Sequence, residues 1–279
     1  PMRIPLGYNL SDAKPVALPL RQTFSLTVYN GNPAGAEHIV STLLQAYCRE
    51  HMELFIVRRN FNSIYADGSD LLQQLQTQTK VTLFEQDKET GLQELFERLM
   101  AIMGERMQLR NEFVQQNGLT RGDPQNTVRA FEYIHAHSTP LMVIFENYYE
   151  FAKSLYDGQA VMFAELFRAQ DPNTTSKKNN GYGYNIYYTA CFGPGEYTLT
   201  AAQTPMADCF NPQKFTLMFG GQLDKCGAVP LPRDYLAINE PDEHYNHCVM
   251  YYQGRLAGLS LPCGELVHVE PDPDEVPII

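Results

Sequence analysis

Short apolar runs alternate with amphipathic stretches over the first 190 residues, and this alternation restricts the fold more than any other feature. Runs rich in β-branched and aromatic residues predict buried strands at 24–29, 53–57, 81–84 and 141–145. Between these runs the apolar residues recur at helical spacing, most clearly in 38–47 and 91–117. Strands that alternate with helices predict an α/β domain whose mostly parallel sheet carries helices on both faces.

The rest of the chain adds shorter elements to this plan. Residues 1–23 predict two short strands joined by a turn at Ser11 and Asp12. Further helices are predicted at 71–79, within 118–138 and from 148 to about 168, and further strands at 185–190, 215–219 and 248–252. The methionines of the long helix, Met100, Met103 and Met107, follow its apolar spacing and are predicted to lie in the core. We expect one domain, with an N-terminal segment (1–23), a core (24–265) and an acidic, Pro-rich tail (266–279).

The charge balance argues against nucleic acid as a partner. The chain has 279 residues and a net charge of −11, whereas nucleic-acid binding relies on basic patches. One basic pair, Lys177 and Lys178, lies in a segment with the composition of a solvated loop. No run of about 18 apolar residues occurs, so we expect no membrane-spanning helix.

The six cysteines are scattered without a CxxC pair, which favours buried thiols in a reducing compartment over a disulfide framework. His244, His247 and Cys248 stand close in the sequence and, with Cys226 or Cys263, could form a metal site. Structural zinc sites show tighter paired spacings, so we favour a metal-free strand flanked by histidines and expect no bound metal.

The stretch FSLTVYNGNPAGAEHIVSTLL, residues 24–44, has the layout of a phosphate-binding loop between a strand and a helix. A working loop of this kind reads G-x-x-x-x-G-K-[ST], and its Lys and hydroxyl contact phosphate and Mg²⁺. Here Asn30 replaces the first Gly, Gly31 follows it, and Gly35 keeps the second Gly. Ala36 and Glu37 stand where Lys and Ser or Thr belong.

These substitutions act against nucleotide binding. Ala36 removes the cation that offsets the γ-phosphate charge, and Pro33 removes an N–H that could face a phosphate. Glu37 adds a carboxylate; a like-charge contact at about 4 Å costs roughly 1 kcal/mol in water and about 4 kcal/mol at an effective dielectric of 20. The same glutamate could instead be an ordinary first-turn acid on a surface helix. Both interpretations predict a chain that does not bind ATP and Mg²⁺.

A second element supports a phosphate-loop ancestry. The apolar strand LMVIF at 141–145 ends in Glu146 and Asn147. An apolar strand that ends in an acid matches the strand that holds the Mg²⁺- or water-positioning carboxylate in phosphate-loop ATPases. A buried parallel strand with a polar carboxyl end is an equally good explanation of this run taken alone.

With both elements placed, the chain resembles the FtsK/SpoIIIE-type ATPases, and within them the C-terminal ATPase modules of type VII secretion motors of the EssC/EccC type. The likeness follows the family's order along most of the chain, in IPLGYNLSDAKPVALPL, FSLTVYNGNPAGAEHIVSTLLQAY, ELFIVRRNF, PLMVIFENYYEF and GYGYNIYYTACF. The departures are informative. Arg58 stands where relatives carry an acid, and Glu146 stands where they carry Asp.

The resemblance implies a RecA-like phosphate-loop NTPase fold without ATPase activity. It implies a cytoplasmic module of a membrane-anchored, oligomeric motor, with neighbouring ATPase modules of the same chain and secreted proteins as partners. The role would be regulation, assembly or substrate recognition. Two alternatives remain: an atypical NTPase in which Arg58 or Arg59 replaces the missing Lys, and a DNA-translocating motor domain.

Overall fold

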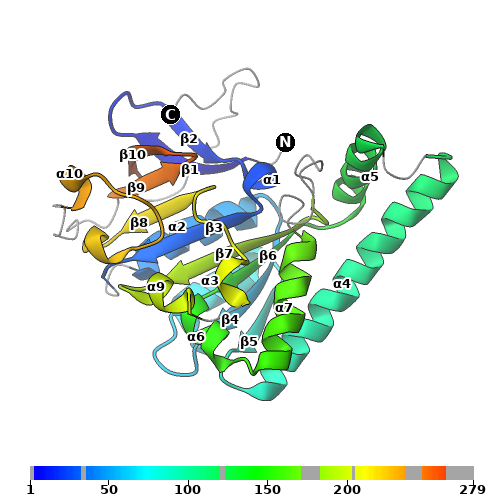
Figure 1. The fold of residues 1–279 in the computed structure, drawn as a ribbon, viewed down its shortest axis with the longest axis horizontal. Helices are drawn as coiled ribbons and strands as arrows, with labels where there is room; N and C mark the ends of the chain where they lie inside the picture. The colour runs from blue at the N-terminus through cyan, green and yellow to red at the C-terminus, as the bar shows by residue number, and fades with distance from the viewer. Residues whose placement is uncertain are drawn as a thin grey trace.

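The computed structural model describes residues 3–32, 36–119, 123–170, 183–202, 205–236 and 247–261. Its described residues form one sheet in the order β2-β1-β10-β9-β8-β3-β7-β6-β4-β5 (Figure 1). The strands are β1 (Ile4–Asn9), β2 (Pro15–Leu18), β3 (Ser25–Asn30), β4 (Glu53–Arg58), β5 (Val81–Glu85), β6 (Leu141–Phe145), β7 (Ile186–Phe192), β8 (Thr216–Phe219), β9 (His247–Tyr252) and β10 (Arg255–Ser260).

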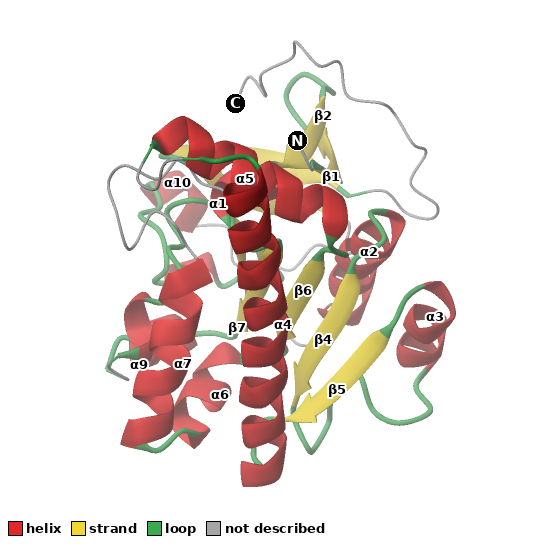
Figure 2. Cartoon of the chain, turned by 90° about the vertical axis from the view of Figure 1, so that its right-hand side faces the viewer, coloured by secondary structure: helices red, strands yellow, loops and turns green. Residues whose placement is uncertain are grey.

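Helices connect and cover these strands (Figure 2). The helices are α1 (Leu20–Thr23), α2 (Ala36–Arg49), α3 (Asp70–Gln78), α4 (Glu89–Gln116), α5 (Pro124–His137), α6 (Tyr148–Ser154), α7 (Asp157–Gln170), α9 (Glu196–Thr200) and α10 (Arg233–Leu236), with 3-10 turns at Met206–Asp208 and Leu223–Lys225. No helix in the described ranges combines the length and hydropathy that a membrane span requires.

The strands β8, β3, β7, β6, β4 and β5 run parallel, as the alternating pattern predicted. Their carboxyl ends therefore meet at one edge of the sheet. β7 lies between β3 and β6. Because neighbouring strands are about 4.8 Å apart, the loop after β3 and the acid after β6 lie roughly 10 Å apart across this edge.

The remaining four strands are antiparallel and extend the sheet beyond β8. The predicted N-terminal strands are confirmed as β1 and β2. The sequence analysis missed β10, which pairs with β9 in a hairpin. Its turn residues Gln253 and Gly254 have φ of 47° and 87°, the left-handed pair that a tight hairpin turn needs.

Helices cover both faces of the sheet, as predicted, with α2 and α3 on one face and α4, α6 and α7 on the other (Figure 2). Alternate side chains of β4 point to opposite faces of the sheet. Leu54 and Ile56 pack with Tyr47 of α2, whereas Phe55 and Val57 pack with α4 and its neighbours. This two-sided burial explains why the central strands read as continuous apolar runs.

The long helix α4 corrects one prediction. Leu92, Leu95 and Leu99 are buried as expected, but Met100 and Met107 are 47% and 41% exposed. Apolar spacing predicted the helix correctly but not how far the core extends along it. The later turns of α4 pack against α5, where the rings of Phe113 and Tyr133 stack with centroids 4.6 Å apart.

The predicted helix from 148 to about 168 is also wrong, because it is two helices. Leu155, after α6, has φ −85° and ψ 135°, an extended conformation that ends the helix. α7 then starts at Asp157, a residue suited to a first helical turn. The short helix expected within 118–138 is α5, whose start is capped by the Asp123 side chain on the Gln125 N–H.

Candidate functional site

The candidate site lies at the carboxyl edge of the parallel strands, where the predicted loop follows β3. Asn30 Oδ1 accepts a hydrogen bond from the Asn32 N–H at 3.1 Å, which closes a local turn. The Gly31 N–H donates to the Phe219 carbonyl at 2.7 Å. A phosphate cradle needs backbone N–H groups that point at the ligand, and both of these already have partners inside the chain.

The same loop packs tightly against the end of β8. Gln222 Nε2 donates to the Gly31 carbonyl at 2.9 Å, and the Tyr29 hydroxyl donates to the Gln222 carbonyl at 2.6 Å. A Cβ on Gly31 would lie 1.9 Å from the Gly221 carbonyl oxygen, so only glycine fits there. Of the other predicted loop residues, Gly35 lies outside the described residues, and Ala36 and Glu37 are described only as the start of the α2 backbone.

Glu146, the predicted acid after β6, is held by the loop that follows β4. Its Oε2 accepts hydrogen bonds from the Arg59 N–H at 2.7 Å and the Ser63 hydroxyl at 2.8 Å. Its Oε1 accepts from the Ile64 N–H at 2.9 Å. The side chain of Glu146 is 9% exposed. The Glu146 carboxylate therefore links the end of β6 to residues 59–64.

Asn147 also has internal partners on both sides of its amide. Its Oδ1 accepts from the Glu150 N–H at 2.9 Å and so caps α6. Its Nδ2 donates to the two carboxylate oxygens of Glu196 at 2.9 and 3.1 Å. Sequence reasoning missed Glu196. The available signal was a Gly–Pro–Gly turn directly before a first-turn acid, because Gly195, with φ 77°, precedes α9.

Arg58, the departure from the family pattern, is engaged by neighbouring acids. Its Nη1 donates to the Tyr65 carbonyl and to Asp67 Oδ1, both at 2.8 Å, and its Nη2 lies 3.6 Å from Glu85 Oε1. The hydrogen bond from Arg58 lowers the pKa of Asp67, while Lys88 and then Arg58 lower the pKa of Glu85. Arg58 therefore ties the loop after β4 to the end of β5. Arg59 is exposed.

The charges of Glu146 and Arg59 both affect the pKa of Cys191 on β7. Burial, and after it the charge of Glu146, raise the pKa of its thiol to about 12, against the opposing effect of the Arg59 charge. A thiol with this pKa stays protonated at neutral pH and is a poor nucleophile. The described surroundings of Cys191 hold the carboxylates of Glu146 and Glu196 and the guanidinium of Arg59.

The sequence also suggested a metal site in the segment HYNHC, residues 244–248. His247 begins β9 and Cys248 is buried within it, while Cys226 is buried beyond the end of β8. His244 and Cys263 lie outside the described residues. Within the described ranges, no group of three or more His, Cys, Asp or Glu side chains is placed to hold a metal ion.

Comparison with known proteins gives matches by structure only. No protein-family model and no curated protein matches the chain. The cytoplasmic domain of EssC aligns with TM-score 0.63 and 11% identity, over 93% of this chain and 43% of that one. Thermomonospora curvata EccC (ATPases 2 and 3), solved with a signal sequence peptide, aligns with TM-score 0.57 and 15% identity, over 95% and 41%.

The cytoplasmic domain of the Thermomonospora curvata type VII secretion ATPase EccC aligns with TM-score 0.59 and 12% identity, over 94% of this chain and 29% of that one. This chain thus spans less than half the length of each of these structures. The predicted RecA-like ATPase fold is confirmed, and so is the likeness to EssC and EccC at the level of the fold. Identities of 11 to 15% support the fold alone.

Proposed function

From the fold that this chain shares with the ATPase domains of EssC and EccC, we propose that it is a non-hydrolysing module of a type VII protein secretion motor. It acts in regulation, assembly or recognition of secreted proteins. Its place is in the cytoplasmic part of a membrane-anchored, oligomeric protein, beside other ATPase modules of the same chain.

The observation that carries this proposal is the state of the Glu146 carboxylate. Both oxygens already accept hydrogen bonds from residues 59–64. Three of the roughly four lone-pair sites of the carboxylate are thus in use, so Mg²⁺ or a catalytic water would compete with these hydrogen bonds. Each partly buried backbone N–H that lost its acceptor would cost about 1–3 kcal/mol. The residues present therefore fit Mg²⁺ and ATP poorly.

The loop after β3 supports the same conclusion. The N–H groups of Gly31 and Asn32 are used internally, and Ala36 supplies no cation. Transition-state charge in phosphoryl transfer must be met by several preorganised groups at once. With the loop Lys, the hydroxyl and the acid all lost or engaged, we propose that ATP and Mg²⁺ do not bind.

Thermal unfolding with and without Mg²⁺-ATP tests the proposal. At 100 times a dissociation constant, a ligand stabilises by about 2.7 kcal/mol, which in a chain of this size raises Tm by roughly 5 °C or more. We expect no such shift. A rise of that size contradicts the proposal that ATP and Mg²⁺ do not bind, and release of phosphate contradicts the proposal that the module does not hydrolyse ATP.

One observation favours a second candidate, an atypical NTPase. The Arg59 guanidinium is exposed and lies close enough to Cys191 to affect its pKa. An Arg forms a planar fork and is not equivalent to the point charge of a Lys, so this candidate is the weaker one. If it is correct, Arg59→Ala abolishes a turnover that the unmodified chain shows.

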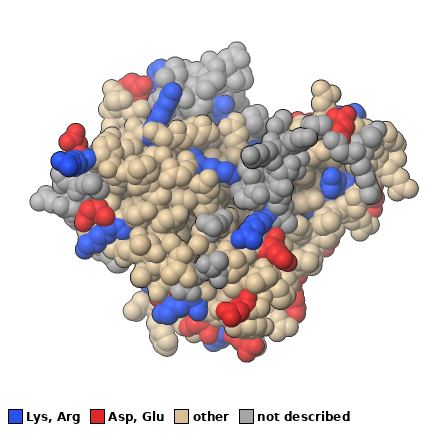
Figure 3. Space-filling model, viewed as in Figure 1, with Lys and Arg blue, Asp and Glu red and all other residues tan. Residues whose placement is uncertain are grey.

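The charge distribution disfavours the DNA-translocating alternative. The net charge is −11, and on the face drawn in Figure 3 the Lys and Arg side chains are scattered among uncharged residues and do not form a stripe. A groove that follows a phosphate backbone needs clustered positive charge. Salt-sensitive DNA binding is the measurement that would revive this alternative.

A further inference from the structure

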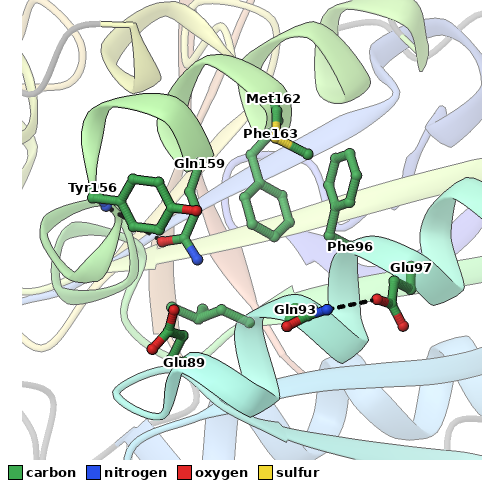
Figure 4. A pocket seen from close by; sticks show the side chains of 9 residues that line it. Glu89, Gln93, Phe96, Glu97, Tyr156, Gln159, Met162 and Phe163 are labelled. Carbon is green, nitrogen blue, oxygen red and sulfur yellow. Dashed lines mark hydrogen bonds between the residues drawn. The ribbon is translucent and has the colours of Figure 1, made fainter.

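A groove of about 370 Å³ lies between α4 and α7, on the opposite face of the sheet from α2. Figure 4 shows its two walls. One is the first turns of α4, and the other is Tyr156 with the first turns of α7. The wall residues of α4 recur at spacings of three and four residues, so they form one face of that helix. Neither wall takes part in the candidate nucleotide site.

The groove has an apolar floor and an apolar rim. At the floor, the rings of Phe96 and Phe163 meet edge to face with centroids 5.3 Å apart, and Leu92 is buried beside them. At the rim, Tyr156 is 61% exposed and Met162 is 46% exposed. Large apolar side chains that stay exposed around a hollow are typical of a surface that a partner covers.

The charges of the groove are all of one sign. Glu89 and Glu97 line it on the α4 side, and no Lys or Arg lines it. Glu97 accepts a hydrogen bond from the Gln93 amide at 2.8 Å (Figure 4), and within the described residues neither carboxylate has an ion-pair partner. The neighbouring Glu94, in contrast, pairs with Arg98 at 3.1 Å.

We propose that this groove binds an amphipathic helix of another protein or module, with apolar anchors flanked by Lys or Arg. Docking of an apolar helix face into a groove is a common mode of peptide recognition. Glu89 and Glu97 are eight residues apart on α4, a separation of about 12 Å at 1.5 Å per residue. A partner helix running along α4 therefore places its cations about eight residues apart, with its anchors between them.

The same charges disfavour other occupants. A second copy packed through this groove about a two-fold axis would bring Glu89 and Glu97 close to their own copies, and like charges repel. An anionic membrane surface is disfavoured for the same reason. The proposal concerns a different face from the nucleotide site, so it holds whether or not the chain hydrolyses ATP.

The test uses labelled helical peptides of about 18 residues, followed by fluorescence anisotropy with the whole chain. The first probe carries Leu and Phe anchors flanked by two Lys. The second has Glu in place of both Lys, and the third has Ser in place of both anchors. We expect saturable, salt-sensitive binding of the first probe and at least about tenfold weaker binding of the other two.

Two pairs of chain variants locate the binding. Met162→Lys, on the rim, is matched by Val161→Lys, because Val161 is 48% exposed and lies outside the groove. Glu97→Lys is matched by Glu112→Lys, because Glu112 accepts the same kind of amide hydrogen bond from Gln108 on the same helix, at 2.8 Å. The first member of each pair should weaken binding of the Lys probe about tenfold, and its control should change it less than about twofold.

Exchanging the charges of the groove and the probe gives the strictest test. In the chain with both Glu89→Lys and Glu97→Lys, the Glu-flanked probe should bind better than the Lys-flanked one. The proposal is overturned if the first probe does not bind or if the groove variants match their controls. It is also overturned if the double variant still binds the Lys-flanked probe better than the Glu-flanked one. It is equally overturned if sedimentation shows a dimer that Met162→Lys dissociates, since the occupant is then a second copy.

Discussion

Glu146 Oε2 accepts a hydrogen bond from Ser63 Oγ at 2.8 Å, across 83 residues of sequence. The Ser63 hydroxyl in turn accepts from the Tyr65 N–H at 3.0 Å, and the Tyr65 side chain is 1% exposed. Glu146, at the end of β6, thus holds the loop after β4 in place where Tyr65 enters the core. Its role in this geometry is structural.

Glu146→Ala should therefore destabilise the chain. It leaves the Arg59 and Ile64 N–H groups without their acceptor, and we expect a loss of about 2–4 kcal/mol in the free energy of unfolding. Urea unfolding measures the loss, and hydrogen exchange should show faster exchange at residues 59–65. The control is Glu150→Ala, because Glu150 is in a solvent-exposed ion pair with Lys153 at 3.6 Å and its removal should cost less than about 0.5 kcal/mol. An unchanged stability in Glu146→Ala contradicts the structural role.

Asn147→Asp should also destabilise. The change replaces two donated hydrogen bonds by a second carboxylate facing Glu196, so bonding is lost and repulsion is added. We expect a cost of about 2–3 kcal/mol. A double-mutant cycle with Glu196→Gln should recover part of it, because the repulsion disappears, and purely additive effects would show that the two side chains are not coupled.

Restoring the loop residues should not restore activity. In Ala36→Lys with Glu37→Thr, the cation and hydroxyl return, but Glu146 stays bonded to residues 59–64 and the Gly31 N–H stays bonded to Phe219. We expect no phosphate release above that of the unmodified chain. Clear turnover in the double variant would mean that the internal hydrogen bonds yield to nucleotide.

Arg106 should be important for stability although it lies far from the candidate site. It is 6% exposed, and its two terminal nitrogens donate to the carbonyls of Tyr184 and Thr139, both at 2.6 Å. Arg106→Met leaves both carbonyls unpaired and should cost about 2–4 kcal/mol in urea unfolding. Arg98→Met, in an exposed pair on the same helix, is the control and should cost less than about 0.5 kcal/mol.

His135 should make the chain less stable in mild acid. Burial, and then the charge of Arg21, lower its pKa from 6.5 to about 4. The unfolded chain therefore binds more protons than the folded chain between these values, so the free energy of unfolding falls as the pH drops from about 6.5 to 4, by at most about 3 kcal/mol. His135→Gln should flatten the pH dependence in this window. The lowered pKa values of Asp67 and Glu85 act at more acidic pH, below their ordinary values of 3.8 and 4.5.

The fold could be predicted where burial leaves a direct trace in the sequence. The run at 141–145 is apolar throughout because both faces of β6 are covered, and it was found on that basis. β10 was missed because Gly258 interrupts its pattern; the space beside Gly258 is taken by Leu10, where a Cβ would lie 2.9 Å from that side chain. The break at Leu155 was missed because apolar spacing continues across it from α6 into α7.

The candidate site could be predicted only in part. The sequence predicted that Glu146 and Asn147 follow a buried strand, and they follow β6. The interpretation of Ala36 and Glu37 as replacements for a loop Lys and hydroxyl stays a prediction. The sequence could not show that Glu146 is bound by Ser63 and Ile64, because those contacts depend on the path of a loop more than 80 residues earlier. Arg58 was interpreted as a possible replacement cation, but its acidic neighbours come from two other segments.

The close contact at Gly31 has a mechanical consequence for the whole sheet. Among the described strands, the antiparallel ones join the parallel ones where β9 pairs with β8, and β8 pairs with β3 next to this glycine. A methyl group at position 31 would clash with the Gly221 carbonyl after β8, so we expect β8 and the antiparallel strands to be displaced from β3. The need for bare backbone at this point therefore comes from the alignment of the two halves, and it would persist in a chain that never meets a phosphate.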